Sequence, residues 1–175
     1  AFNNGTFLNT GFDAGSSVLW DIQALPDGGM IAAGTVRVRH GQRLTGESQL
    51  ALVKYNFDGS LDFNFGAGGK IAATPRGMAG AFQLELTPDG GFIVCGSATT
   101  GGNPMEASGG EFLLKFTSTG KIDTTFGKDG VLKPENIITF AVDAQGRILV
   151  GGYHDHDGLT DATLTRYTAG GALDT

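Results

Sequence analysis

The chain has 175 residues, a formal net charge of −6 and a hydrophobic content of 40%, which suffices for a folded domain with a sizeable core and argues against disorder. Its 12 basic residues are scattered singly, so no basic stripe follows a phosphate backbone, and we predict no nucleic-acid partner. The longest apolar runs are far shorter than the roughly 20 residues that span a bilayer, so we expect no membrane insertion.

Three tandem repeats run through the chain, and we place them at residues 1–63, 64–124 and 125–175 of a single repeat domain. Their most conspicuous block is a turn followed by an apolar run: LPDGGMIAAG from Leu25, TPDGGFIVCG from Thr87 and DAQGRILVGG from Asp143. This alignment places one glycine of each repeat in register, namely Gly34, Gly96 and Gly152. The 30 glycines follow no G-X-Y period and come with only five prolines, so they indicate turns.

Within each repeat the pattern predicts four strands. The first strand has apolar residues at every second position, as in Trp20, Ile22 and Ala24 around Asp21 and Gln23. A glycine-containing turn, Asp-Gly in the first two repeats, then leads into the second strand, which favours a hairpin. A third strand carries a basic residue, and a short apolar fourth strand is expected at residues 5–9, 69–73 and 130–133.

Short antiparallel strands in tandem repeats of roughly 50 to 60 residues are typical of a β-propeller. We therefore predict an all-β fold of propeller-type blades, built as three four-stranded antiparallel repeats. A parallel β-helix has shorter coils without an internal hairpin, and a β-sandwich is a further alternative. Because closed propellers have about four to eight blades, three blades form a partial propeller that needs neighbours.

The three blocks together have the form PDGG-apolar-G, LxKY/F-x-x-DG and S/K-L/I-D-x-x-F-G-x-x-G. This combination resembles the delta-sixty repeat family, bacterial tandem repeats thought to build β-propellers, and the resemblance covers all three repeats. The third repeat departs from it, because DAQGR replaces the Pro-Asp-Gly turn. The resemblance implies an extracellular or cell-surface bacterial protein, and no common catalytic activity comes with it.

A basic residue and an aspartate eight positions later recur in every repeat: Lys54 with Asp62, Lys115 with Asp123, and Arg166 with Asp174. A catalytic pair is needed once, whereas a structural pair is needed in each blade. We therefore predict ion pairs that hold the turn between the third and fourth strands.

The stretch YHDHDGLTDA, residues 153–162, contains the one candidate metal site. Asp155, Asp157 and Asp161, with Gly158, resemble a calcium loop in which alternate carboxylates face one ion. The match is incomplete, because Tyr153 stands where an acid is needed and no terminal Glu follows. The alternatives are adventitious binding of a transition metal by the neighbouring histidines and a plain polar loop. We expect no other cofactor.

The sequence offers no set of nucleophile, base and orienting residue, so we predict no catalytic residues and a non-catalytic structural or interaction module. Cys95 falls at a small position of the second strand and is expected to be a packed thiol. Three long loops at residues 35–49, 97–111 and 153–162 are predicted to make the contacts. Two alternatives are a carbohydrate-binding, lectin-like propeller and a calcium-dependent hydrolase with its site in a central channel.

The expected partners are copies of the chain or neighbouring repeats of a longer one, with a surface protein or glycan as further possibilities. The final segment GGALDT followed by the first residues AFNNG reproduces the motif GKIDTTFGKDG with one residue fewer. Phe2 then aligns with Phe65 and Phe126. We expect that another copy, or a parent chain, continues the repeat at this point.

Overall fold

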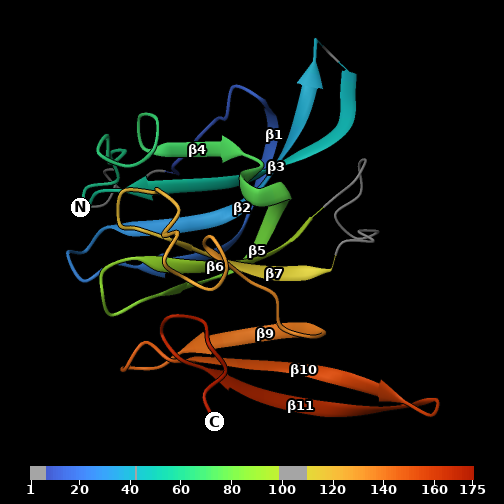
Figure 1. Ribbon diagram of the computed structural model, residues 1–175. Helices are drawn as coiled ribbons and strands as arrows, with labels where there is room; N and C mark the ends of the chain where they lie inside the picture. Colours follow the sequence, from blue (N-terminus) through green and yellow to red (C-terminus); the bar gives the residue numbers. More distant parts are fainter. Residues whose placement is uncertain (1–6, 42, 99–109) are drawn as a thin grey trace. The chain divides into compact units, whose positions relative to one another are not determined.

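The computed structural model describes residues 7–41, 43–98 and 110–175 of the chain (Figure 1). These residues form three antiparallel sheets, and each sheet uses strands that follow one another in the sequence. The first sheet contains β1 (Gly15–Ala24), β2 (Met30–His40), β3 (Arg43–Tyr55) and β4 (Lys70–Ala73). The second contains β5 (Met78–Leu86), β6 (Phe92–Ala98), β7 (Glu111–Phe116) and β8 (Val131–Leu132). The third contains β9 (Ile137–Val142), β10 (Ile148–His156) and β11 (Leu159–Tyr167).

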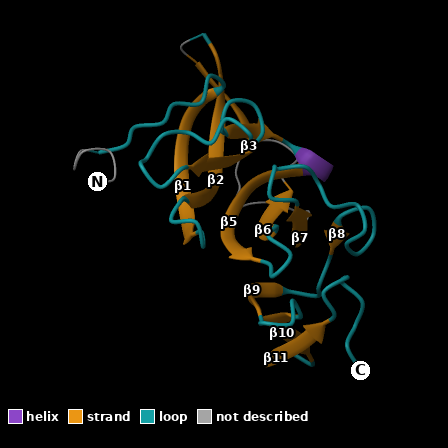
Figure 2. Ribbon diagram, turned by 90° about the vertical axis from the view of Figure 1, so that its left-hand side faces the viewer, coloured by secondary structure: helices purple, strands orange, loops and turns teal. Residues whose placement is uncertain are grey.

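The prediction of an all-β fold of propeller-type blades is confirmed. The first two sheets have the predicted four strands, and the third has three within the described residues, in the order β11-β10-β9. The fourth strand expected at residues 5–9 is not formed by its described part, because residues 7–9 lie outside any strand. Residues 5 and 6 lie outside the described ranges. The helical structure in the described chain is a short 3-10 turn at Pro75–Gly77, purple in Figure 2.

The chain divides into two compact units. The first comprises Ala1–Leu84 with Gly96–Gly109, and the second Glu85–Cys95 with Gly110–Thr175. The second sheet therefore has strands in both units. That the whole chain is one repeat domain stays a prediction. No helix in the described part of the chain is long and apolar enough to cross a membrane.

The core of the first unit includes a cluster on one face of the first sheet. Alternate residues of β2 and β3 point to that face, where the segment around Phe12 packs over them. The buried members are Phe12, Ala32, Val36, Ala51, Val53 and Tyr55. Strands β1 and β5 are also joined in this unit, since the Leu84 N–H donates to Asp21 Oδ2 at 2.7 Å and Gln23 Nε2 donates to the Leu84 carbonyl at 3.1 Å.

The core of the second unit lies between β6–β7 and β9–β10. It contains Ile93, Cys95, Leu113, Phe126, Ile137, Phe140, Ile148 and Val150. Phe126 comes from the Asp-x-x-Phe motif rather than from a strand, and it is almost completely buried. The motif therefore inserts an aromatic side chain between two successive sheets.

The three glycines that the alignment places in register share one structural cause. At Gly34, Gly96 and Gly152 an added Cβ would fall on a backbone carbonyl oxygen, from Val18 in β1, from Gly80 in β5 and from Asn136 directly before β9 respectively. The strand pairing is irregular at two of these places, where the register shifts between Leu19 and Asp21 and between Gly151 and Gly152. Glycine is required there because the first and second strands approach too closely for a side chain.

Candidate functional site

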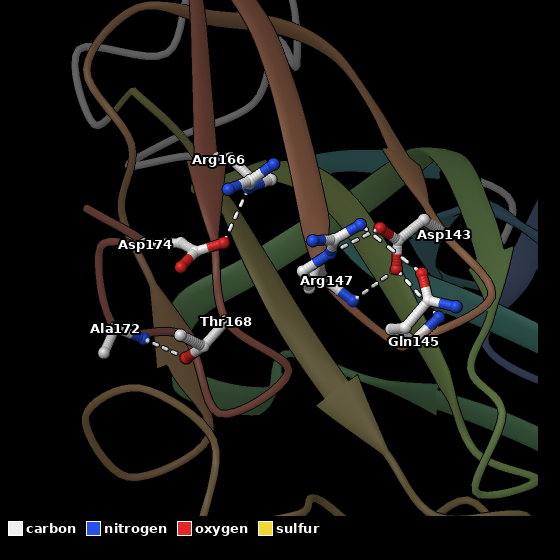
Figure 3. Close-up of polar contacts among 7 residues, drawn as sticks. All are labelled: Asp143, Gln145, Arg147, Arg166, Thr168, Ala172 and Asp174. Atoms are coloured by element: carbon white, nitrogen blue, oxygen red, sulfur yellow. Dashed lines mark hydrogen bonds and ion pairs between the residues drawn. The ribbon is translucent and has the colours of Figure 1, made fainter.

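The predicted ion pairs are present in all three repeats. Lys54 Nζ lies 3.0 Å from Asp62 Oδ2, and Lys115 Nζ lies 3.2 Å from Asp123 Oδ2. In the third repeat Arg166 Nε lies 2.6 Å from Asp174 Oδ2 (Figure 3). In each case the aspartate N–H also donates to the carbonyl of its basic partner, at 2.9, 2.9 and 3.0 Å. The pair therefore holds the end of the third strand to the turn that follows it, as the spacing predicted.

A second carboxylate, Asp89, joins the pair of the second repeat and was not foreseen from the sequence. It comes from the Pro-Asp-Gly-Gly turn, and its Oδ2 lies 2.5 Å from Lys115 Nζ. Burial alone would raise the pKa of Asp89, but hydrogen bonds from Lys115, Thr87 and the Gly91 N–H outweigh it and lower the pKa to about 2. The pKa of Lys115 is raised, because its two carboxylate partners outweigh the effect of its burial.

These shifts predict how stability depends on pH. The pKa of Asp89 is lower in the folded than in the unfolded chain, so its stabilising contribution is present above pH about 4 and is lost as the pH falls toward about 2. We expect Lys115→Met to lower the melting temperature at pH 7. We also expect the melting temperature of this variant to fall less steeply than that of the wild type between pH about 4 and pH about 2. Thermal melts of both proteins from pH 2 to pH 7 measure this. Equal slopes for the two proteins would contradict the assignment to the Lys115 pair.

The third repeat replaces the Pro-Asp-Gly-Gly turn by one with a different set of side-chain bonds. Asp143 Oδ1 accepts hydrogen bonds from the N–H groups of Gln145 and Arg147, both at 2.9 Å. Its Oδ2 accepts another from Arg147 Nε at 2.6 Å (Figure 3). The backbone bonds of the turn are those of the other two repeats, since the Asp143 N–H donates to the Arg147 carbonyl and the Gly146 N–H to the Asp143 carbonyl. The Asp143 side chain adds its bonds to these, so the DAQGR sequence supports the same hairpin.

Residues 35–49 and 153–162 are mostly strand, so the prediction that they are loops was wrong, while the prediction that they make contacts stays a prediction. Strands β10 and β11 pair continuously from Ile148↔Tyr167 to His156↔Leu159. The two residues between them, Asp157 and Gly158, both have positive φ, of 46° and 79°. This is the backbone of a tight two-residue hairpin turn, for which Asp-Gly is a preferred sequence. Strands β2 and β3 similarly reach His40 and Arg43. The loop at 97–111 lies largely outside the described residues.

The hairpin separates the candidate calcium ligands. Asp161 is paired with His154 in the ladder, so Asp155, one residue further, points to the opposite face. Asp155 Oδ1 accepts a hydrogen bond from Thr160 Oγ1 at 2.6 Å, and Asp161 Oδ2 lies 3.6 Å from His156 Nε2. Asp157 is in the turn. Within the described residues no group of three His, Cys, Asp or Glu side chains is placed to hold a metal ion. A calcium site requires the hairpin to rearrange, and it stays a prediction.

Cys95 is fully buried in the core of the second unit, which confirms the prediction of a packed thiol. Burial, and to a lesser extent the charge of Glu111, raises the pKa of the Cys95 thiol to about 12. The thiolate is therefore scarce at neutral pH, and this cysteine is unreactive.

An unexpected feature is the outer face of the third sheet, which we define as the side of β10 and β11 that carries Leu149, Gly151, Leu164 and Arg166. The repeat alignment makes Leu164 equivalent to Leu52 and Leu113, which are both 0% exposed, whereas Leu164 is 76% exposed. The opposite side of this sheet, with Ile148 and Val150, packs into the core of the second unit. Leu149 and Gly151 on this face are half-buried, so Leu164 is its exposed large apolar side chain.

Part of the chain is similar to a known family of domains. Residues 145–175 match the family model of a domain of unknown function (DUF5122) described as a β-propeller. No curated protein matches the chain. The matched stretch includes the end of the third repeat's turn, β10, β11 and the Arg166–Asp174 pair. This stretch is therefore similar to a β-propeller repeat, in agreement with the fold.

Proposed function

We propose that the chain is a structural or interaction module of a bacterial secreted or cell-surface protein, and that it associates with further repeats or with copies of itself. The recurrence of the same three blocks, with their ion pairs and buried phenylalanines, supports a role in building a repeat array. The likeness of residues 145–175 to a β-propeller model supports it as well. On the three blocks taken together, we propose the delta-sixty repeat family as its family.

The observation that carries this proposal is the exposure of Leu164. A leucine at the same position of the first two repeats is fully buried, so the repeat sequence is adapted to a covered face. The difference between the repeats, rather than the exposure of one leucine by itself, supports a contact at this position. Successive repeats of such arrays bury one another, and the third sheet retains the side chains for that contact.

The mass of the protein in solution tests the proposal. We expect particles that are multiples of 18.1 kDa at micromolar concentrations, measured by sedimentation or light scattering. A folded monomer of 18.1 kDa at every accessible concentration, with no partner repeat in a parent chain, would contradict it.

A further inference from the structure

We propose that the basic end of the β2–β3 hairpin in one copy of the chain binds the acidic end of the β10–β11 hairpin in a second copy. The charged residues of the two ends are Arg37, Arg39 and Arg43 on the first hairpin, and Asp155, Asp157 and Asp161 on the second. This inference rests on the proposed function and adds the charges that decide how two copies meet.

The basic end gathers positive charge in a chain whose net charge is −6, and no other stretch of the sequence brings three basic residues so close together. Arg37 and Arg39 lie on the same side of the first sheet, because Arg39 Nη2 donates to Ser16 Oγ at 3.0 Å and Ser16 is paired with Arg37. Arg43 begins β3, where it is paired with His40. All three arginines are exposed, and the ion pairs among the described residues include none of them.

The acidic end has the opposite charge. Residues 153–162 contain three aspartates and no lysine or arginine. The three carboxylates are exposed, and the ion pairs among the described residues include neither Asp155 nor Asp157. Asp161 Oδ2 lies 3.6 Å from His156 Nε2. Like charges on one hairpin repel one another, so a partner that brings positive charge is favoured at this end.

The acidic end is continuous with the face that we propose for association. Gly151 is paired with Leu164, and Asp155 lies on the same side of β10 as Gly151, because side chains alternate along a strand. Asp155 therefore belongs to the outer face of the third sheet, and a copy that covers Leu164 comes close to it. Complementary charges beside an apolar contact steer the partner and fix its orientation. The basic end of a second copy supplies the complementary charge.

Reversing the charges of the two hairpins tests this contact. The arginine variant carries Arg37→Glu and Arg39→Glu, and the aspartate variant carries Asp155→Lys and Asp161→Lys. All four side chains are exposed, so the core is unchanged in both variants. Each variant reverses two charges because a single charge at an exposed contact has a small effect.

A third variant, with Lys121→Glu and Lys128→Glu, is the matched control. It has the same net charge as the arginine variant, but both of its sites are exposed and lie outside the two hairpins. We expect the control to associate as the wild type does in sedimentation at about 0.1 M salt. We expect the arginine variant and the aspartate variant, each by itself, to associate at least about tenfold more weakly.

An equal mixture of the arginine and aspartate variants is expected to recover the association of the wild type. In the mixture the acidic β2–β3 hairpin of one variant meets the basic β10–β11 hairpin of the other, so the charges are complementary again. No recovery in the mixture, or equal weakening of the control, would overturn the hairpin contact. If the wild type nevertheless associates, the proposed function stands and only this contact is wrong. If the wild type stays at 18.1 kDa at every concentration, the contact and the self-association both fail.

Discussion

Phe65→Ala is expected to lower the free energy of unfolding by about 3–5 kcal/mol, the range for removing a fully buried phenylalanine. Phe65 is 0% exposed although it lies in a turn motif rather than a strand. The motif is also held by backbone bonds, since the Phe65 N–H donates to the Asp62 carbonyl and the Gly69 N–H to the Phe65 carbonyl. Removing the ring leaves a cavity that these bonds prevent from collapsing.

The same motif supplies the control for this prediction. Phe63, two residues earlier, is 78% exposed, so Phe63→Ala is expected to change stability by less than about 0.5 kcal/mol. Chemical denaturation of both variants and the wild type measures the difference. A similar loss of unfolding free energy in the two variants would show that the Asp-x-x-Phe motif does not anchor the repeat through the ring of Phe65.

Gly152→Ala is expected to destabilise the third sheet by about 1–3 kcal/mol, the usual cost of forcing an additional group into a closely packed site. The new Cβ would meet the carbonyl oxygen of Asn136, and this backbone atom cannot move without breaking the pairing of β9 with β10. The loss should appear in thermal melts as a lower melting temperature with an unchanged far-ultraviolet spectrum at low temperature.

Its neighbour Gly151 is the matched control. A Cβ at Gly151 would meet the Thr139 Cγ2 atom at 3.2 Å, which is a side-chain contact that can adjust. The equivalent positions of the other repeats carry Ala33 and Cys95, so the fold accepts a side chain here. We expect Gly151→Ala to be tolerated. A larger loss at Gly151 than at Gly152 would contradict the explanation given for the glycines in register.

The fold was predictable because its signals are local and repeated three times. The turn sequences, the alternation of apolar residues and the spacing from Lys54 to Asp62 each reflect one hairpin or one ion pair, and the structure has them. The described residues 7–9 depart from the expected fourth strand, since they lie outside any strand.

Long hairpins were harder to recognise than short ones. A loop is expected at residues 35–49 between the second and third strands, yet most of this segment belongs to β2 and β3. Alternating valines at Val36 and Val38 were the available signal for a strand. Polar side chains are compatible with a strand where one or both faces meet water, so composition alone misleads there.

Burial could not be predicted from the repeat alignment. Ile22, Leu84 and Phe140 occupy equivalent positions, but Ile22 is exposed whereas Leu84 and Phe140 are buried. Leu164 is likewise exposed, whereas the equivalent Leu52 and Leu113 are buried. The alternation within a repeat indicates which residues share a face, but whether other residues cover that face depends on the rest of the fold. The second partner of Lys115, Asp89, was not visible from the eight-residue spacing, because it lies 26 positions earlier in the turn between β5 and β6.

The central claim is that the outer face of the third sheet is the surface through which the chain associates. The most direct measurement is the particle mass of the wild type beside Leu164→Lys and the control Leu159→Lys, each at several concentrations by sedimentation. Both sites are exposed, so all three proteins should have the same melting temperature when dilute. We predict that the wild type and Leu159→Lys associate and that Leu164→Lys stays at 18.1 kDa. Association of Leu164→Lys as strong as that of the wild type would contradict the claim.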